Sequence, residues 1–458
     1  MTAAPAAPLA VPPRPRWLET VRLQWQLRHD IPGVMTYLAR NIGPFVRTRL
    51  PLHLYFISAP AVIEEVLVKQ AASFRKDSIS RLIARAIGNG LVVSEGDFWR
   101  RQRRLMQPAF HHAQLRSYAE TMTALAVDHV STWRPGETRN VHEDMMALTM
   151  KVAAKLLFSA DLSADARDIG ETITALMVDF SGNLGLTALT PLTRLPTPRQ
   201  RRIDKSIRRL DEIVYRIIAE RRAAADPGSD LLALLLAAQD ENGARMSDQQ
   251  IRDETLTLFV AGHETTAQLL TYALYLLAGS PDEQEALAAE VTEVLEGRAP
   301  QFSDLEQLKR TEAVLSETMR LYPPVWGIGR EALTDVELGG YRLPKGSSVF
   351  MSQWAVHRDP ALFTDADRFV PGRWLGTPAP LPRFAYFPFG GGPRICIGNR
   401  FAMMEATLIL AVLIQRFALG TTPETRLELL PTVTLRPKGP VSLAVTARAG
   451  ALRSSPAA

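Results

Sequence analysis

The sequence predicts a mainly α-helical protein with small β-sheets, folded as one compact unit. Three observations favour this class. Apolar residues recur at helical spacing over most of the chain, the extended segments are few and short, and no repeat or long linker divides the 458 residues. The chain is long for one domain, so the absence of a linker is what favours one unit over two.

The helices are predicted from their apolar spacing and their end signals. An amphipathic, basic stretch predicts a helix over residues 200–225, and the Asp-Pro-Gly-Ser-Asp that follows predicts the turn that ends it. Another helix is expected over 231–240. A long helix is expected from Asp248 through Leu277, because Gly279-Ser-Pro281 then supplies a helix end and a new start.

Extended segments are expected at four places, and one division of the chain is expected. The segments are 51–58, 336–343, 347–351 and 427–445. Residues 1–40 are interpreted as an N-terminal extension that is partly flexible, and residues 41–458 as the main unit.

Composition places the chain among ordinary soluble globular proteins, with 46% hydrophobic and 22% charged residues. Residues 1–16 are rich in alanine and proline, with neither an apolar core of signal-peptide length nor a span of about 20 apolar residues. We therefore expect a cytoplasmic monomer with no membrane anchor.

The net charge of +5 could indicate nucleic acid, anionic membrane or an acidic protein partner. No nucleic-acid module is visible, so a nucleic-acid partner is not expected.

The only cysteine, Cys396, lies in the most informative stretch of the chain, Phe389-Gly-Gly-Gly392-Pro-Arg394-Ile-Cys396-Ile-Gly398. A single thiol forms neither an internal disulfide nor a cysteine-based zinc site. The glycines allow close backbone approach to a flat cofactor, and N–H groups before the following helix can stabilise a sulfur anion. Arg394 could neutralise an acidic edge of that cofactor. The stretch predicts an axial thiolate ligand; the alternative is a buried structural cysteine.

This stretch resembles the pattern Phe-x-x-Gly-x-Arg-x-Cys-x-Gly of the cytochromes P450, the heme-thiolate monooxygenases. The resemblance covers most of the chain and is weakest before about residue 40 and between 161 and 200. It implies the single-domain cytochrome P450 fold and heme b with Cys396 as the axial ligand. Phe389, Gly392, Arg394 and Gly398 would then belong to the cofactor site. Thiolate ligation pushes electron density onto the iron and favours O–O bond cleavage.

A second motif, Ala-Gly-His-Glu-Thr-Thr at 261–266, lies within the predicted long helix. A glycine inside a helix costs about 1 kcal/mol relative to alanine, so Gly262 needs a reason. Together with Ala261 it lets a flat group pack against the helix. Glu264 and Thr265 supply an acid and a hydroxyl for proton delivery. The segment resembles the family's oxygen-activating motif, which implies that Thr265 hydrogen-bonds the activated oxygen and that Glu264 relays protons from solvent.

The alternative for this motif is a threonine that caps its own helix beside an exposed Glu264. We interpret His263 as filling space and not as a metal ligand.

Two further sets of residues match family positions. Glu317 and Arg320 are three residues apart on a predicted helix, and Arg373 matches a third partner, although Gly372 and Trp374 replace the family's glutamate and phenylalanine. The resemblance implies a buried triad that holds the cysteine loop.

The second set would contact the heme propionates and consists of Trp99, Arg103, Arg330 and Arg394. A solvated basic helix is the alternative, and it suits three neighbouring arginines well: Arg100, Arg101 and Arg104.

The resemblance implies a monooxygenase that uses O₂ and two electrons to hydroxylate or epoxidise a hydrophobic small molecule. The chain has no dinucleotide fingerprint, so the electrons are expected from a separate ferredoxin or flavodoxin with an NAD(P)H-dependent reductase. Arg100, Arg101, Arg104 and Arg400 could form its docking face. Alternatives are a peroxygenase, an isomerase or ring-coupling enzyme, and a non-catalytic heme sensor.

The substrate pocket is expected from segments 78–96, 173–195, 256–265, 325–329 and 432–435. Apolar residues among them favour a terpenoid, fatty acid, steroid or polyketide. These residues are Val325, Trp326, Ile328, Val433 and Leu435.

Overall fold

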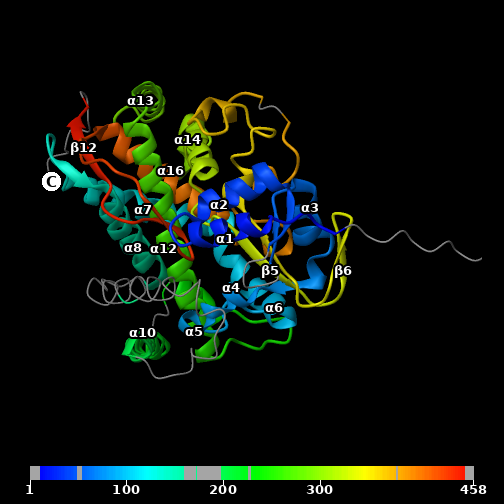
Figure 1. Cartoon of the computed structure of the whole chain (residues 1–458). Helices are drawn as coiled ribbons and strands as arrows, with labels where there is room; N and C mark the ends of the chain where they lie inside the picture. The colour runs from blue at the N-terminus through cyan, green and yellow to red at the C-terminus, as the bar shows by residue number, and fades with distance from the viewer. Residues whose placement is uncertain are drawn as a thin grey trace, which may run out of the picture.

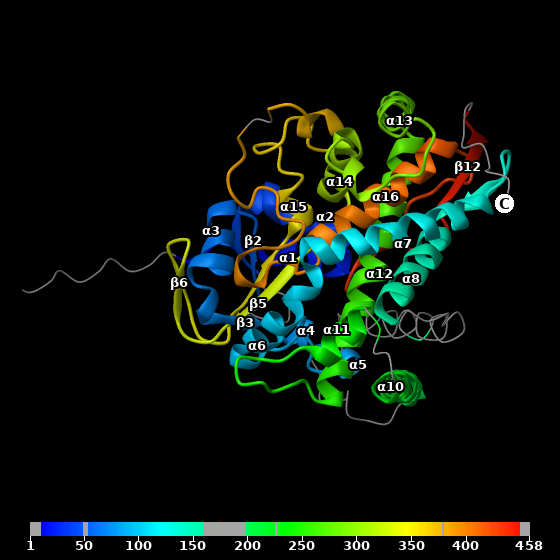
Figure 2. The ribbon, with the colours of Figure 1, turned by 180° about the vertical axis from the view of Figure 1, so that it is seen from behind.

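Long helices form one half of the molecule, and a small sheet with shorter helices forms the other (Figure 1). The structure is a computed structural model that describes residues 11–48, 54–158, 172, 198–224, 228, 230–377 and 380–448. Helix α12 runs through the middle of the molecule in both views (Figure 2). The predicted class, mainly α with small sheets, is confirmed.

The described helices have the following bounds: α1 Trp17–Gln26, α2 Ile31–Tyr37, α3 Pro60–Glu64, α4 Ser78–Leu82, α5 Ala84–Ile87, α6 Gly96–Met106, α7 His112–Ser131, α8 Val141–Phe158, α10 Pro198–Ala223, α11 Leu231–Ala237, α12 Asp248–Ala278, α13 Pro281–Leu295, α14 Lys309–Leu321, α15 Gln353–Val356 and α16 Asn399–Arg416. None of these described helices is both long enough and apolar enough to cross a bilayer.

The strands are short: β1 Phe45–Arg47, β2 Leu54–Ile57, β3 Phe74–Lys76, β4 Thr138–Asn140, β5 Ile328–Ala332, β6 Val336–Leu338, β7 Tyr341–Leu343, β8 Ser348–Met351, β9 Phe417–Thr421, β10 Leu429–Pro431, β11 Leu435–Pro437 and β12 Ser442–Ala447. The main sheet has the order β1-β2-β8-β5-β3, with β2 and β8 parallel and the other pairs antiparallel. A second sheet has the order β4-β12-β9, and β6-β7 and β10-β11 are hairpins.

Helix α12 was predicted to within one residue, because its ends are determined locally. The Ser247 hydroxyl accepts a hydrogen bond from the Gln250 N–H at 3.2 Å, and the Ser247 N–H donates to the Gln250 side-chain oxygen at 2.8 Å. The helix ends before Gly279 and Pro281. Helix α10 agrees with the predicted basic helix, whereas α11 ends at Ala237, earlier than expected, because Ala238 is extended.

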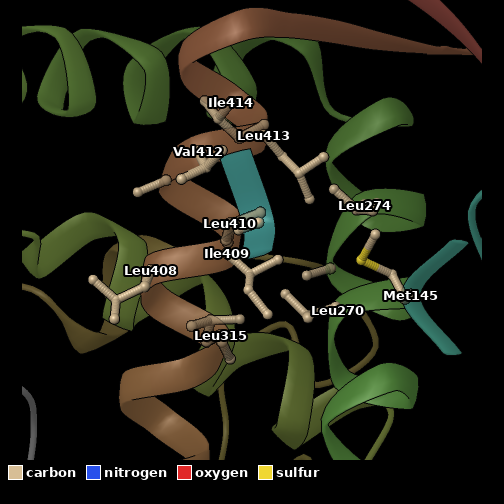
Figure 3. Packing of buried hydrophobic residues seen from close by; sticks show 14 of the residues in the cluster. Met145, Leu270, Leu274, Leu315, Leu408, Ile409, Leu410, Val412, Leu413 and Ile414 are labelled. Carbon is tan, nitrogen blue, oxygen red and sulfur yellow. The ribbon is translucent and has the colours of Figure 1, made fainter. Parts of the chain in front are cut away.

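The largest core cluster joins α7, α8, α12, α13, α14 and α16. Residues 404–414 of α16 are all buried, so this helix is buried on every side rather than amphipathic. Figure 3 shows side chains of α16 packed against Leu270 and Leu274 of α12 and Leu315 of α14. This close packing fixes the start of α16, directly after the cysteine loop.

The main sheet extends the core toward the N-terminus. Leu23 of α1 and Val34, Met35 and Leu38 near α2 pack against Val46 and Phe56 of the sheet, and Ala355 also joins this cluster. The division predicted at residue 40 stays a prediction.

Candidate active site

The backbone of the cysteine loop requires its glycines. Gly390 and Gly392 have φ of 71° and 66°, which side chains rarely adopt. A Cβ on Gly392 would lie 1.8 Å from the Leu67 carbonyl oxygen, and one on Gly391 would lie 2.2 Å from the Phe384 ring. The loop therefore lies directly against Leu67 and Phe384, and a side chain at Gly391 or Gly392 would not fit.

The Cys396 thiol is accessible, yet it is densely surrounded. Burial raises its pKa, while a hydrogen bond from the Gly398 N–H and the charge of Arg103 oppose that rise. The sulfur is therefore accessible although protein atoms surround it closely. A metal cation there would replace the thiol proton, because the thiolate is the ligand form of cysteine.

Helix α12 presents its smallest residues to open space. Ala261 is exposed and Gly262 is half-buried, although most residues around them on this helix are buried. A Cβ on Gly262 would meet no atom within 4 Å. The Thr265 hydroxyl donates to the Ala261 carbonyl at 2.7 Å, so it lies beside the same opening. An accessible sulfur and an accessible small-residue stretch fit a flat group.

The Glu264 carboxylate is buried, so the alternative of an exposed Glu264 is wrong. Its Oε1 accepts a hydrogen bond from the Thr434 hydroxyl at 2.6 Å and forms an ion pair with Arg436 Nε at 3.4 Å. Both partners come from the β11 region of the chain. The structure therefore shows the Glu264 carboxylate in contact with Thr434 and Arg436, and buried away from solvent.

Several buried polar atoms near Glu264 have no hydrogen-bond partner. They are Nδ1 of His142, both amide atoms of Gln268 and Nη1 of Arg436. Burial and the charge of Arg436 lower the pKa of His142 to about 4. Such atoms are places for ordered water. The group therefore forms a polar layer between Glu264 and His142, which is half-buried.

His263, in contrast, is fully engaged within the helix. Its ring Nδ1 lies 2.9 Å from the Phe259 carbonyl oxygen, and its own carbonyl accepts from the Thr149 hydroxyl at 2.9 Å. This agrees with a packing role.

Three basic side chains meet near Trp99, on the side of α6. The Arg394 guanidinium lies over the Trp99 ring at 4.4 Å. Burial and Arg394 lower the pKa of the buried Arg330 to about 10, and burial, Arg330 and Arg394 lower that of Lys76 to about 7. Cations that depress one another's pKa values in this way are typical of a site for an acidic ligand.

Glu95 partly balances this charge, since its carboxylate accepts from Arg394 and from the Lys76 N–H. One guanidinium atom, Nη1 of Arg394, is buried without a partner. The prediction missed Lys76, which the pairing of β3 with β5 sets directly opposite Arg330. A lone lysine on a three-residue strand gives no signal in the sequence.

Arg103 lies near the same cations. Its guanidinium is 5.8 Å from the centroid of the Trp99 ring, and its charge adds to burial in lowering the pKa of Arg394. Its Nη1 also donates to the Ile395 carbonyl at 2.9 Å, so it contacts the cysteine loop as well. The contact of Arg103 with a heme propionate stays a prediction.

The Glu317 triad forms as expected and has an extra donor. Arg320 donates to both carboxylate oxygens at 2.8 and 2.9 Å, and Arg373 Nε lies 3.0 Å from each. The Trp374 indole donates to Oε2 at 2.9 Å, and the Val370 N–H to Oε1 at 2.9 Å. The tryptophan that departs from the family pattern thus joins the network.

Comparison with known proteins agrees with this site. The family model described as "Cytochrome P450" matches residues 12–444. The chain belongs to the cytochrome P450 family. It is a cytochrome P450 monooxygenase, and the family binds heme b through a cysteine thiolate.

Relatives in Streptomyces cover most of this cytochrome P450. "Cyclooctatin synthase" of Streptomyces melanosporofaciens is 40% identical over 86% of this chain and 86% of its own. "Cyclooctat-9-en-7-ol 5-monooxygenase" of the same organism is 37% identical over 84% of each chain. "Pentalenene oxygenase" of Streptomyces avermitilis is 33% identical over 97% of this chain and 98% of its own.

The expected pocket segments of this cytochrome P450 are only partly supported. Val325, Trp326 and Ile328 are half-buried and Val433 is exposed, whereas Leu435 is fully buried and its carbonyl accepts from the Tyr272 hydroxyl. Leu435 is therefore not a lining residue. Segment 173–195 lies outside the described residues.

The expected docking arginines are mostly paired with acids. Arg100 contacts Asp97, Arg104 contacts Glu241, and Arg101 lies 2.6 Å from Asp240. Arg400 is exposed and has no carboxylate partner among the residues that the structure describes.

Proposed function

We propose that Cys396 supplies the thiolate that holds the iron of heme b in this monooxygenase. The observation that carries this is the accessible sulfur that accepts the Gly398 N–H, at the end of a loop whose glycines permit no larger residue. Bound heme would supply O₂ activation. The flat ring would lie along Ala261 and Gly262, with its acidic edge toward Lys76, Arg330, Arg394 and Trp99.

The test is the carbon-monoxide difference spectrum of the reduced protein. The wild type should give the strongly red-shifted Soret band of thiolate ligation, and Cys396→Ser should lose it. Arg103→Lys serves as a matched control, because it alters the loop contact but keeps the sulfur. An unchanged band in Cys396→Ser would contradict the assignment.

We infer that Thr265 and Glu264 deliver protons during O₂ activation. Thr265 lies beside the opening at Ala261, and Glu264 is the buried acid next to it. Arg436 and Thr434 position the Glu264 carboxylate, so protons would reach it through the polar layer that ends at His142. Thr265→Ala should release peroxide in place of product, measured as the ratio of product to NAD(P)H consumed. Full coupling in this variant would remove the role.

We propose a cyclic terpenoid as the substrate. Two relatives are named for cyclooctat-9-en-7-ol and pentalenene, and the exposed apolar residues of this chain include Val433, in an expected pocket segment. Binding of a substrate that displaces water from the iron shifts the heme spin state, so a ligand screen reads out the class directly. Polycyclic terpene alcohols should give the largest shift, and a fatty acid of similar size should give little. The reverse order would overturn the terpenoid class.

We propose that the electrons come from a separate acidic ferredoxin or flavodoxin that docks near Arg400. This side chain lies four residues after Cys396, is exposed and has no described carboxylate partner. Arg400→Glu should raise the KM for the reduced carrier several-fold and weaken its dependence on ionic strength. Arg100→Glu is the control, because Asp97 already neutralises that arginine.

A further inference from the structure

Helix α1 exposes apolar side chains on its outer face. Trp17 and Trp25 are 67% and 65% exposed, Leu18 is 80% exposed and Val21 is 49% exposed. At about 100° per residue, these four positions lie within an arc of about 100° on one side of the helix. The buried side of α1 holds only Thr20 and Leu23.

This orientation is the reverse of that of an ordinary surface helix, which turns its apolar stripe to the core. The reversal is fixed by contacts on the inner side. The Tyr37 hydroxyl donates to Glu19 at 3.2 Å, the Arg22 guanidinium lies 4.9 Å over the Tyr37 ring, and Leu23 packs in the cluster with Val34. Turning the tryptophans inward would break all three. A contiguous exposed apolar face of this kind marks an interaction surface.

The surroundings of this face are positively charged. Arg14, Arg16, Arg22 and Arg28 are all exposed, and Glu19, engaged as a helix cap, is the only acidic residue between 11 and 29. Tryptophan beside arginine on a short amphipathic helix is the composition of segments that lie in the boundary between lipid headgroups and acyl chains. The helix faces the viewer in Figure 1 and lies at the back in Figure 2, so its outer side is at the molecular surface.

We propose that α1 docks this protein on the surface of an anionic lipid bilayer. Trp17, Leu18, Val21 and Trp25 enter the interface, and the arginines contact lipid phosphates. With 10 residues the helix is about 15 Å long, too short to span a hydrocarbon core of about 30 Å, so it lies along the membrane. A second copy is the poorer occupant, because a symmetric contact would bring the same arginines together.

The test is co-flotation of the full-length holoenzyme with vesicles of phosphatidylcholine, alone or mixed with phosphatidylglycerol. The wild type should bind the mixed vesicles, with a blue shift of its tryptophan emission. A Trp17→Ser and Trp25→Ser double variant should bind at least about tenfold more weakly. An Arg14→Gln and Arg28→Gln double variant should lose the preference for phosphatidylglycerol. Arg16 is left unchanged because its backbone caps the helix.

The matched control is Tyr215→Ser, which removes another exposed aromatic side chain on α10 and should bind like the wild type. The carbon-monoxide spectrum and the unfolding midpoint of the tryptophan and arginine variants should equal those of the wild type, because the substituted side chains are exposed. Absence of vesicle binding by the wild type at low salt would overturn the proposal. So would equal binding by the tryptophan variant, or a lipid-independent dimer that this variant abolishes.

Discussion

Two buried carboxylates of this cytochrome P450, Glu317 and Glu264, each lie beside an arginine, but their environments differ. Glu317 accepts from Arg320, Arg373, the Trp374 indole and a backbone N–H, so both oxygens are saturated. Glu264 has one hydrogen bond, from Thr434, and one ion pair at 3.4 Å. The Arg436 that pairs with Glu264 has a buried atom, Nη1, without a hydrogen-bond partner, whereas both Glu317 oxygens have donors.

The difference separates a structural carboxylate from one able to change partners. Burial alone would raise the pKa of Glu317, but the hydrogen bonds and charge of Arg320, with Val370 and Arg373, lower it below its ordinary value. Such a group stays ionised and holds one geometry. Fewer contacts hold Glu264, which suits the proton delivery that we propose for it.

The largest expected effect is on stability, from Glu317→Ala. The substitution leaves the buried Arg320 without its carboxylate, which costs about 3–5 kcal/mol. Urea unfolding and heme content should both report the loss. Glu312→Ala, an exposed position on the same helix α14, should change the free energy of unfolding by less than about 0.5 kcal/mol. If Glu317→Ala unfolded at the same urea concentration as the wild type, the contrast between Glu317 and Glu264 would not hold.

Glu264→Gln should lower turnover, and it should also lower stability, because the buried Arg436 loses the charge of the carboxylate with which it pairs. The amide still accepts from Thr434 but carries no transferable proton, so product formation should fall about 100-fold. The measurements are product formation per NAD(P)H and the solvent isotope effect. Glu254→Gln makes the same change in the same helix α12, away from the motif at 261–266, and should keep its turnover. If both variants turned over like the wild type, Glu264 would be as structural as Glu317.

A third buried carboxyl, Glu405, has no arginine partner among the residues that the structure describes, so it tests the role of pairing. Burial raises its pKa from 4.5 to about 8, and a hydrogen bond from Thr266 opposes the rise only partly. Because the folded pKa is the higher one, its contribution to stability is complete below pH 4.5 and is lost as pH rises toward 8. Each pH unit in that window costs up to about 1.4 kcal/mol.

Glu405→Gln should remove this slope, measured by urea unfolding between pH 6.5 and 8. Burial also raises the pKa of Glu254 to about 8, but Glu254 is present in both the wild type and the variant. The difference between their two slopes therefore reports Glu405 alone. Identical slopes would mean that Glu405 titrates normally.

The smallest expected effect is that of Trp374→Phe, which restores the family's residue and removes one donor from the Glu317 network. One hydrogen bond to a charged group contributes about 1.5–3 kcal/mol, and the other donors to Glu317 remain, so we expect the lower end. Trp354→Phe, which removes an indole hydrogen bond to a neutral acceptor, the Thr36 hydroxyl, is the control. A loss as large as that of Glu317→Ala would mean that the network has little redundancy.

Local features of the sequence determined the class of fold, the helix α12 and the cysteine loop. Apolar spacing and end signals such as Gly279 and Pro281 act within a few residues, so they could be interpreted without tertiary information. The triad of Glu317, Arg320 and Arg373 could also be predicted, because Glu317 and Arg320 are three residues apart and Arg373 matches a family position.

Only the tertiary structure decided which distant groups meet. Lys76 reaches Arg330 through strands of three and five residues, too short for a clear periodic signal, and Arg436 meets Glu264 from a strand far along the chain. Contacts of this kind depend on how the whole core packs, because long-range pairing follows from the fold and not from local preference. The outward face of α1 was likewise decided by its contacts with α2, since spacing alone predicts an apolar stripe but not the side on which it lies.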